Sequence, residues 1–250
     1  MRRAALLAGF LVLAFAVSSR AEAVKTQQVE LTSGGETIAG FLAVPDSPGK
    51  HPALIVLHED WGLTDWVKEQ AKKLGEQGYV ALAVDLYRGE TTFDAYIAYD
   101  LMVAVPPERA VQDMEAAFNF LAARPDVNKE KIGSIGWSAG GKWSLMLAVN
   151  EPRLAACVVN YGTPISAPAE LEKIHAPVLA IFGADDRTIP QMDIDTFVAA
   201  MDKAKKSLDL KVYPGAGRGF ENSESKLGFR EGAADDAWER SLTFLGEHLK

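Results

Sequence analysis

Residues 136–141 have the sequence GWSAGG, which places one serine, Ser138, between two glycines at the spacing G-x-S-x-G. The apolar, strand-like run KIGSIG precedes this serine, and the helix-like run AGGKWSLMLAV follows it. This context predicts a nucleophile elbow, because small neighbours permit a strained turn that exposes the serine hydroxyl. The amide N–H of Ala139, at the start of the helix, would then stabilise an oxyanion. The alternative is a glycine-rich turn that packs a helix against a sheet.

Charged side chains follow four other apolar runs. They are Glu59 and Asp60 after PALIVLH, Arg88 after YVALAVD, Asp185 and Asp186 after PVLAIFG, and Arg218 after LDLKVYP. Parallel strands end at the same edge of a sheet, and the ligand sites of α/β proteins lie at that edge. The functional residues are therefore expected just after these runs.

The elements that must position these residues alternate between short apolar runs and amphipathic stretches. Residues 26–45 predict an antiparallel hairpin that turns at Gly34 and Gly35. Six further β-rich runs predict parallel strands covered on both faces by helices. They are PALIVLH, YVALAVD, KIGSIG, AACVVNY, PVLAIFG and LDLKVYP. We therefore expect one α/β domain with a doubly wound, mostly parallel sheet entered through the hairpin.

Two helical stretches carry apolar stripes. Steps of three and four residues put the apolar side chains of each stretch on one helix face. The stripes are Val111, Met114, Phe118 and Leu121 in the first stretch, and Trp238, Leu242, Leu245 and Leu249 in the second. The second stripe predicts a closing helix that packs on the sheet.

The N-terminal residues have the layout of a secretory signal peptide. Two arginines precede about a dozen apolar residues, and small residues stand at Ala21 and Ala23. We predict that residues 1–23 are cleaved and that residues 24–250 form one exported domain, periplasmic or secreted. The apolar run is shorter than the roughly 18 to 20 residues of a membrane span, so no membrane anchor is expected after cleavage.

Composition narrows the function further. A formal net charge of −8 argues against a nucleic-acid-binding surface. The only cysteine, Cys157, lies in the apolar run LAACVVNYG, so no internal disulfide is expected and a buried core thiol is predicted. The sequence contains no metal-ligand or cofactor motif.

Five motifs, in this order, resemble those of the dienelactone hydrolase family of the α/β-hydrolase fold. They are LHEDWGL, DLYRG, GWSAGG, FGADDRTIP and YPGAGRGF. The resemblance extends from about Gln27 to Leu249. It implies hydrolysis of a small ester or lactone through a covalent acyl-enzyme, without a cofactor.

The resemblance also places the site residues. It implies that Ser138 is the nucleophile, where the best-known members have cysteine, and that Asp186 is the acid of a catalytic triad. The family's glutamate beside the nucleophile matches Glu59, and the backbone N–H of Asp60 would be the second oxyanion donor. The triad histidine is expected two residues before the phenylalanine of YPGAGRGF, and there the chain has Arg218.

Arginine at this position removes the usual proton acceptor. A guanidinium stays protonated at physiological pH, so Arg218 cannot take the proton of Ser138. Two interpretations of Arg218 stay open. It pairs with Asp186, or it binds an anionic substrate together with Arg88.

None of the histidines is a good replacement. They are His51, His58, His175 and His248. Only His248 follows Asp186 in the chain order of the fold, and it lies off the apolar stripe near the C-terminus. Because side chains alternate along a strand, His58 should face away from the site if Glu59 faces it. We expect His58 to be structural.

Glu59 is then the candidate surrogate base. Burial beside Trp61 and Trp137 would raise the pKa of its carboxyl group toward the range useful for proton transfer. In the alternative, Glu59 pairs with Arg218 or holds the loop. The two tryptophans are candidate apolar contacts for the substrate.

Residues 91–107 are rich in apolar and aromatic side chains. They predict either a lid over the pocket or an extra helix packed on the core. The sequence as a whole favours a serine-type hydrolase of small esters or lactones, including anionic ones. The alternative is a catalytically impaired protein of the same fold that binds a small carboxylate or ester.

Overall fold

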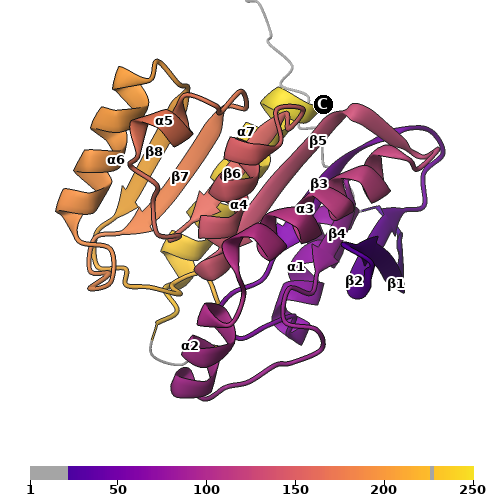
Figure 1. Ribbon diagram of the computed structural model, residues 1–250, viewed down its shortest axis with the longest axis horizontal. Helices are drawn as coiled ribbons and strands as arrows, with labels where there is room; N and C mark the ends of the chain where they lie inside the picture. Colours follow the sequence, from indigo (N-terminus) through magenta and orange to yellow (C-terminus); the bar gives the residue numbers. More distant parts are fainter. Residues whose placement is uncertain (1–21, 226–227) are drawn as a thin grey trace, which may run out of the picture.

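A computed structural model describes residues 22–225 and 228–250, which form one eight-stranded sheet with helices packed against it (Figure 1). The strands are β1 (Val24–Ser33), β2 (Glu36–Pro45), β3 (His51–Leu57), β4 (Val80–Val84), β5 (Val127–Trp137), β6 (Ala156–Asn160), β7 (Val178–Gly183) and β8 (Leu208–Tyr213). Their order in the sheet is β1-β2-β4-β3-β5-β6-β7-β8. Strands β3 to β8 run parallel, and β2 joins them antiparallel to β4. The predicted fold class is confirmed.

The N-terminal hairpin forms as its sequence predicts. Strands β1 and β2 pair antiparallel from Val24 opposite Pro45 to Ser33 opposite Glu36. The two residues between them, Gly34 and Gly35, have φ values of 56° and 87°. Glycine adopts positive φ at little cost, so these two residues permit the tight reversal.

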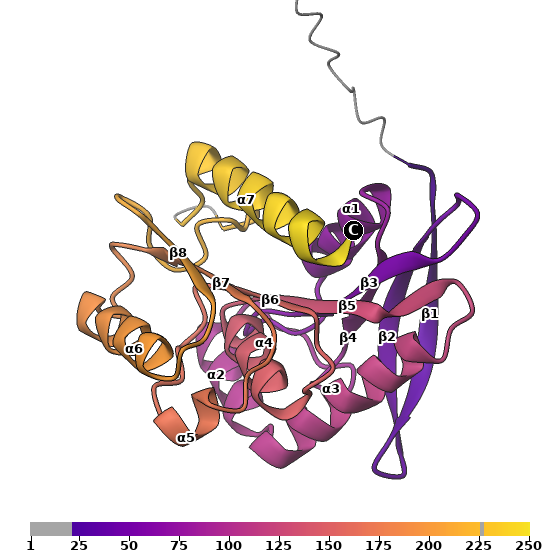
Figure 2. The ribbon, with the colours of Figure 1, turned by 90° about the horizontal axis from the view of Figure 1, so that it is seen from above.

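Helices cover both faces of the sheet, as Figure 2 shows. They are α1 (Asp65–Glu76), α2 (Ala95–Val103), α3 (Pro107–Ala122), α4 (Ala139–Asn150), α5 (Pro168–Leu171), α6 (Gln191–Lys203) and α7 (Glu231–Leu249). Side chains of α1 and α7 pack into the core on one face, and those of α3 to α6 pack into the core on the other. Strand residues alternate between the two cores, with Leu54 and Val56 of β3 on one side and Ile55 and Leu57 on the other.

The closing helix α7 packs on the sheet through its predicted stripe. Leu245 and Leu249 are buried, and Trp238 and Leu242 pack partly buried against the same core. His248 lies near the C-terminal end of α7, where its ring contacts the ring of Phe244.

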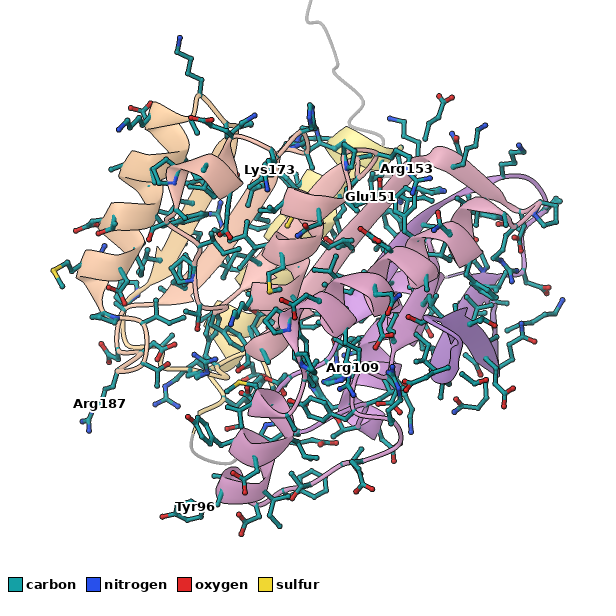
Figure 3. All side chains as sticks on the ribbon, in the orientation of Figure 1. Tyr96, Arg109, Glu151, Arg153, Lys173 and Arg187 are labelled. Atoms are coloured by element: carbon teal, nitrogen blue, oxygen red, sulfur yellow. The ribbon has the colours of Figure 1, made fainter. Side chains whose placement is uncertain are left out.

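Helix α2 lies in the segment for which a lid or an extra packed helix was predicted. Leu101 and Met102 pack against the core, whereas the outward face carries large exposed apolar side chains. Tyr96, 86% exposed, projects into solvent at the edge of the molecule (Figure 3). The helix is therefore docked through its C-terminal half and apolar on its free surface.

Residues 1–21 of the predicted signal peptide lie outside the described residues. Strand β1 begins at Val24, the residue after the predicted cleavage position. Within residues 22–225 and 228–250, no helix is long and apolar enough to cross a membrane.

Cys157 is buried, as expected for a core thiol. Its sulfur lies 3.3 Å from Oγ of Ser144, and burial raises the pKa of the thiol to about 11.

Candidate active site

Ser138 occupies a strained turn between β5 and α4. Its φ and ψ are 56° and −117°, a conformation that a residue with a side chain rarely adopts. The flanking glycines make the turn possible, because a Cβ on Gly136 would lie 2.1 Å from the carbonyl oxygen of Gly140. A Cβ on Gly140 would lie 2.1 Å from the carbonyl oxygen of Leu57, at the end of β3. The motif therefore forms the predicted elbow.

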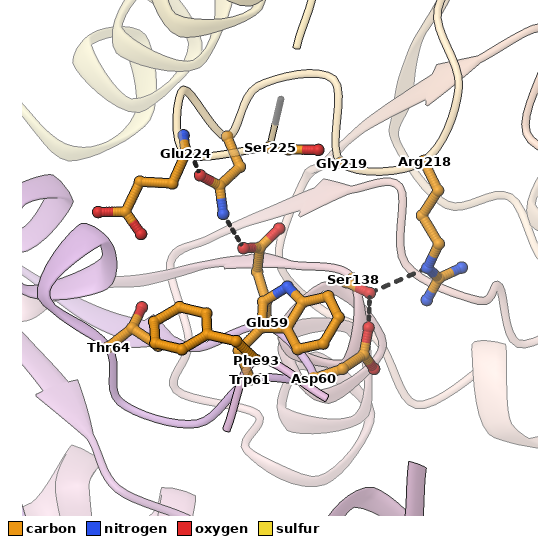
Figure 4. A pocket seen from close by; sticks show the side chains of 11 residues that line it. Glu59, Asp60, Trp61, Thr64, Phe93, Ser138, Arg218, Gly219, Glu224 and Ser225 are labelled. Carbon is orange, nitrogen blue, oxygen red and sulfur yellow. Dashed lines mark hydrogen bonds between the residues drawn. The ribbon is translucent and has the colours of Figure 1, made fainter. Parts of the chain in front are cut away.

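The hydroxyl of Ser138 lies between an anion and a cation (Figure 4). Ser138 Oγ donates a hydrogen bond to Oδ2 of Asp60, and it accepts one of 3.0 Å from Nε of Arg218. The backbone N–H of Ser138 donates to the carbonyl of Asn160 at 3.0 Å. The serine hydroxyl thus accepts a hydrogen bond from the guanidinium of Arg218 and donates one to the carboxylate of Asp60.

Arg218 bridges the distance between Ser138 and Asp186. Its Nη1 donates to Oγ1 of Thr188 at 2.7 Å and lies 3.8 Å from Oδ2 of Asp186. The other oxygen of Asp186 accepts hydrogen bonds from the backbone N–H and the hydroxyl of Thr188, at 2.8 and 2.6 Å. The expected pairing of Arg218 with Asp186 is therefore present.

Glu59 lines the same pocket but has partners other than the serine. Its Oε2 accepts a hydrogen bond of 2.6 Å from Asn222, and its Oε1 accepts one of 3.2 Å from the hydroxyl of Tyr161. Burial, aided by the charge of Asp60, raises the pKa of Glu59 to about 7, against the opposing effect of both hydrogen bonds. The carboxyl group has the raised pKa that its surroundings predict, and its hydrogen bonds hold the loop of Asn222.

The first turn of α4 carries the backbone N–H for which an oxyanion-binding role was predicted. Ala139 is the first residue of the helix, and an N–H in that position has no carbonyl partner within its helix. Asp60 was predicted to contribute only its backbone N–H to the site. Its carboxylate also contacts the serine, a contact that was not predicted.

The pocket in front of Ser138 has a volume of about 280 Å³. Its lining includes Trp61 and, from the segment before α2, Phe93. Trp137, also predicted to contact substrate, is 1% exposed and lies outside this lining. Its Nε1 donates to Oε2 of Glu221 at 2.9 Å, so Trp137 is a buried structural residue next to Ser138 in the chain.

Arg88 does not reach the pocket, contrary to the prediction that it binds substrate. Its Nη1 and Nη2 donate to both oxygens of buried Asp113, at 2.7 and 3.1 Å, and Nη2 also contacts Glu36 at 3.2 Å. These contacts tie the loop after β4 to α3 and to the hairpin. Strand β4 ends at Val84, and Arg88 lies in the following loop at a φ of 60°.

His58 is structural, as predicted. The backbone N–H of Leu86 donates to its Nε2 at 3.2 Å, so Nδ1 carries the proton and donates to the carbonyl of Glu59 at 2.7 Å. Burial lowers the pKa of the imidazole. His58 therefore holds β3 and β4 together as a neutral ring.

Several partners of the predicted residues were not predicted from the sequence. They are the carboxylate of Asp60, Thr188, Tyr161 and Asn222. Thr188 lies within the motif FGADDRTIP, and Asn222 lies two residues after the motif YPGAGRGF. Their nearness to these motifs is the one feature of the sequence that could have indicated them.

A serine at a strained strand-to-helix turn, at the carboxyl edge of a mostly parallel sheet with helices on both faces, defines the α/β-hydrolase class. Residues 38–249 match the model of the dienelactone hydrolase family. The chain belongs to this family.

Individual relatives and a solved structure are similar to this chain over most of its length. A protein of Saccharolobus solfataricus provisionally named carboxymethylenebutenolidase is 29% identical over 88% of this chain and 97% of its own length. A Bradyrhizobium protein named as a probable 2-oxo-3-(5-oxofuran-2-ylidene)propanoate lactonase is also 29% identical, over 91% of this chain and 96% of its own. A crystal structure provisionally assigned as a dienelactone hydrolase of Klebsiella pneumoniae superposes with a TM-score of 0.83 and 26% identity, over 90% of this chain and 99% of that one.

Proposed function

We propose that the protein hydrolyses small carboxylic esters or lactones through an acyl-enzyme on Ser138. The observation that carries this proposal is the serine hydroxyl at the elbow, open to the pocket and held between Asp60 and Arg218. The first-turn N–H of Ala139 is placed to stabilise the oxyanion of the tetrahedral intermediate. The names of the two relatives, a butenolidase and a lactonase, support a lactone substrate.

One side chain of the pocket supports a substrate with an anionic group. Arg218, 27% exposed, is the cationic side chain of a described lining that also contains Asp60 and Glu224. A planar guanidinium suits a carboxylate. The replacement of the triad histidine by Arg218 thus combines a binding role with the loss of the usual base.

The second candidate is a protein of the same fold that binds a small carboxylate or ester with little turnover. Arg218 favours it, because a guanidinium has no lone pair to accept the serine proton. The strained elbow favours the enzyme, because such backbone strain clusters at active sites.

Labelling with a fluorophosphonate, together with a panel of small esters and lactones, separates the two candidates. We expect covalent labelling of Ser138 and slow hydrolysis, both reduced by at least about 10²-fold in Ser138→Ala. Ser166→Ala removes an exposed serine outside the pocket lining and should behave as wild type. Intact-mass spectrometry and a colorimetric ester assay provide the measurements. Equal labelling of Ser138→Ala would contradict the assignment, and binding of esters without labelling or turnover would favour the second candidate.

A further inference from the structure

The carboxylate of Asp60 is the acceptor of the serine's own hydrogen bond. Among residues 22–225 and 228–250, it is the one carboxylate recorded in hydrogen-bond contact with Ser138 Oγ. Glu59 directs its two oxygens to Asn222 and Tyr161, and His58 uses both ring nitrogens in backbone hydrogen bonds. A general base must lie within hydrogen-bond reach of the proton it takes, and Asp60 meets this condition.

We propose that Asp60 is the general base for Ser138 and that Arg218 is a fixed counter-charge beside the serine oxygen. This inference rests on the proposed function, since it concerns the proton transfers of the same reaction. It gives the role of proton acceptor to a side chain that precedes the serine in the chain and is not one of the residues that the resemblance assigns to the triad.

The proton transfers balance. Ser138 Oγ attacks the carbonyl carbon of the ester while its proton moves to Oδ2 of Asp60. As the bond from that carbon to the alcohol oxygen breaks, the alcohol oxygen takes the proton from Asp60. Water then adds to the acyl carbon and gives a proton to Asp60, and this proton returns to Ser138 Oγ when the acyl bond breaks.

Arg218 supplies the charge that a histidine would acquire during the reaction. In a Ser-His-Asp triad, the imidazole becomes positive when it takes the proton, and the aspartate stabilises it. Here Arg218 is positive from the start and already lies 3.8 Å from Asp186 and 3.0 Å from Ser138 Oγ. The guanidinium thus favours negative charge on the serine oxygen, while the moving proton goes to Asp60.

The first test is the rate of fluorophosphonate labelling and of ester hydrolysis in Asp60→Asn. Asparagine keeps the shape of the side chain and cannot take up a proton, so both rates should fall about 10²- to 10³-fold, within the range of general base catalysis. Asp185→Asn is the matched control, because it removes an exposed carboxylate that follows β7 without touching the serine. Circular dichroism checks that both variants are folded.

The second test separates proton transfer from mere positioning. In Asp60→Ala, formate can enter the pocket that Asp60 lines and replace the missing carboxylate. The labelling rate should rise with formate concentration, by about tenfold or more, and chloride at equal ionic strength should have no effect. A purely structural role for Asp60 predicts no such rescue.

The outcomes divide clearly. An Asp60→Asn protein that reacts at the wild-type rate, or an Asp60→Ala protein that formate does not accelerate, overturns the inference and leaves the proposed function standing. A large loss in Glu59→Gln with no loss in Asp60→Asn would transfer the role of base to Glu59. A wild-type protein that neither reacts with fluorophosphonate nor hydrolyses any ester overturns the proposed function itself.

Discussion

Glu59 and Asp60 are neighbours in the sequence, yet their carboxyl groups have different partners. Glu59 is buried, 3% exposed, and receives hydrogen bonds from neutral side chains. Asp60 is half-buried and receives the hydroxyl of Ser138, beside the positive Arg218. The two carboxyl groups therefore have different roles. Glu59 holds the surrounding loops through its hydrogen bonds, and Asp60 contacts the serine.

The raised pKa of Glu59 makes stability depend on pH. The folded protein keeps this proton up to about pH 7, whereas the unfolded chain releases it near pH 4.5. Unfolding therefore releases a proton between these values, and the free energy of unfolding falls as pH rises through that window. The shift in the pKa of Glu59 corresponds to a change of about 3 kcal/mol in the free energy of unfolding. Glu221, with its pKa raised by burial to about 8, acts in the same direction.

Glu59→Gln should remove the Glu59 part of this dependence. We expect wild-type protein to be less stable at pH 8 than at pH 5.5, and the difference to be smaller in the variant. Urea denaturation at both pH values measures it, with Glu239→Gln on the exposed side of α7 as the control. Parallel losses in wild type and Glu59→Gln would contradict the assignment of the raised pKa.

At the scale of single residues, the sequence predicted where the chain supplies charge better than where the side chains point. Alternation along a strand suggested that His58 faces away from the site if Glu59 faces it. Strand β3 ends at Leu57, so alternation applies to His58 only in part and no longer governs Asp60. The direction of Asp60 is set by the loop that turns at Gly62 with a φ of 86°, and local sequence does not determine it.

At the scale of elements, the elbow depends on close contact between the start of α4 and the end of β3. Gly140 lies against the carbonyl of Leu57, which fixes Ser138 near Asp60. The sequence predicted both elements, β3 from its apolar run and α4 from the helix-like run after the serine. It did not predict α5, which has only four residues and is too short to establish a repeat. Nor did it predict which side chains of α2 would face solvent.

Gly140→Ala tests this contact. The new methyl group would lie 2.1 Å from a backbone oxygen, so α4 and β3 must separate. Overpacking of this kind costs about 1 to 3 kcal/mol, and labelling of Ser138 should fall as the serine moves. Gly246→Ala in α7 is the matched control, because its added Cβ meets nothing within 4 Å and alanine favours the helix. Urea denaturation compares them, and a Gly140→Ala protein as stable as wild type would contradict the packing argument.

At the scale of the whole molecule, the alternation of strands and helices predicted the layers but not the strand order. The hairpin strand β2 lies beside β4 rather than beside its sequence neighbour β3. Apolar runs such as β3 and β4 are buried on both faces, so they do not specify which neighbour each one pairs with. The pairing depends on the crossover connections, which only the assembled sheet reveals.

Export is also a property of the whole chain, and we propose it from the N-terminal sequence. The preprotein expressed in a secreting bacterium should lose residues 1–23, and the intact mass of the recovered protein measures this. Cleavage there leaves β1 complete, because β1 begins at Val24, and the mature protein should fold fully. An Ala21→Glu, Ala23→Glu preprotein should be retained uncleaved, since cleavage requires small residues. Full-length wild-type protein in the cytosol would contradict the proposal.

The guanidinium beside Ser138 has a consequence for the surroundings in which the molecule works. Serine hydrolases that depend on an imidazole lose their base as it becomes protonated, near pH 6.5. In the described part of this chain the serine oxygen accepts a hydrogen bond from Nε of Arg218, and both ring nitrogens of His58 form hydrogen bonds with the backbone. Because Glu59 keeps its proton in the folded state, the free energy of unfolding is also higher in this acidic range than at higher pH. We therefore expect the hydrolysis proposed for Ser138 to lose less of its rate between pH 7 and pH 5 than an imidazole-dependent hydrolase does.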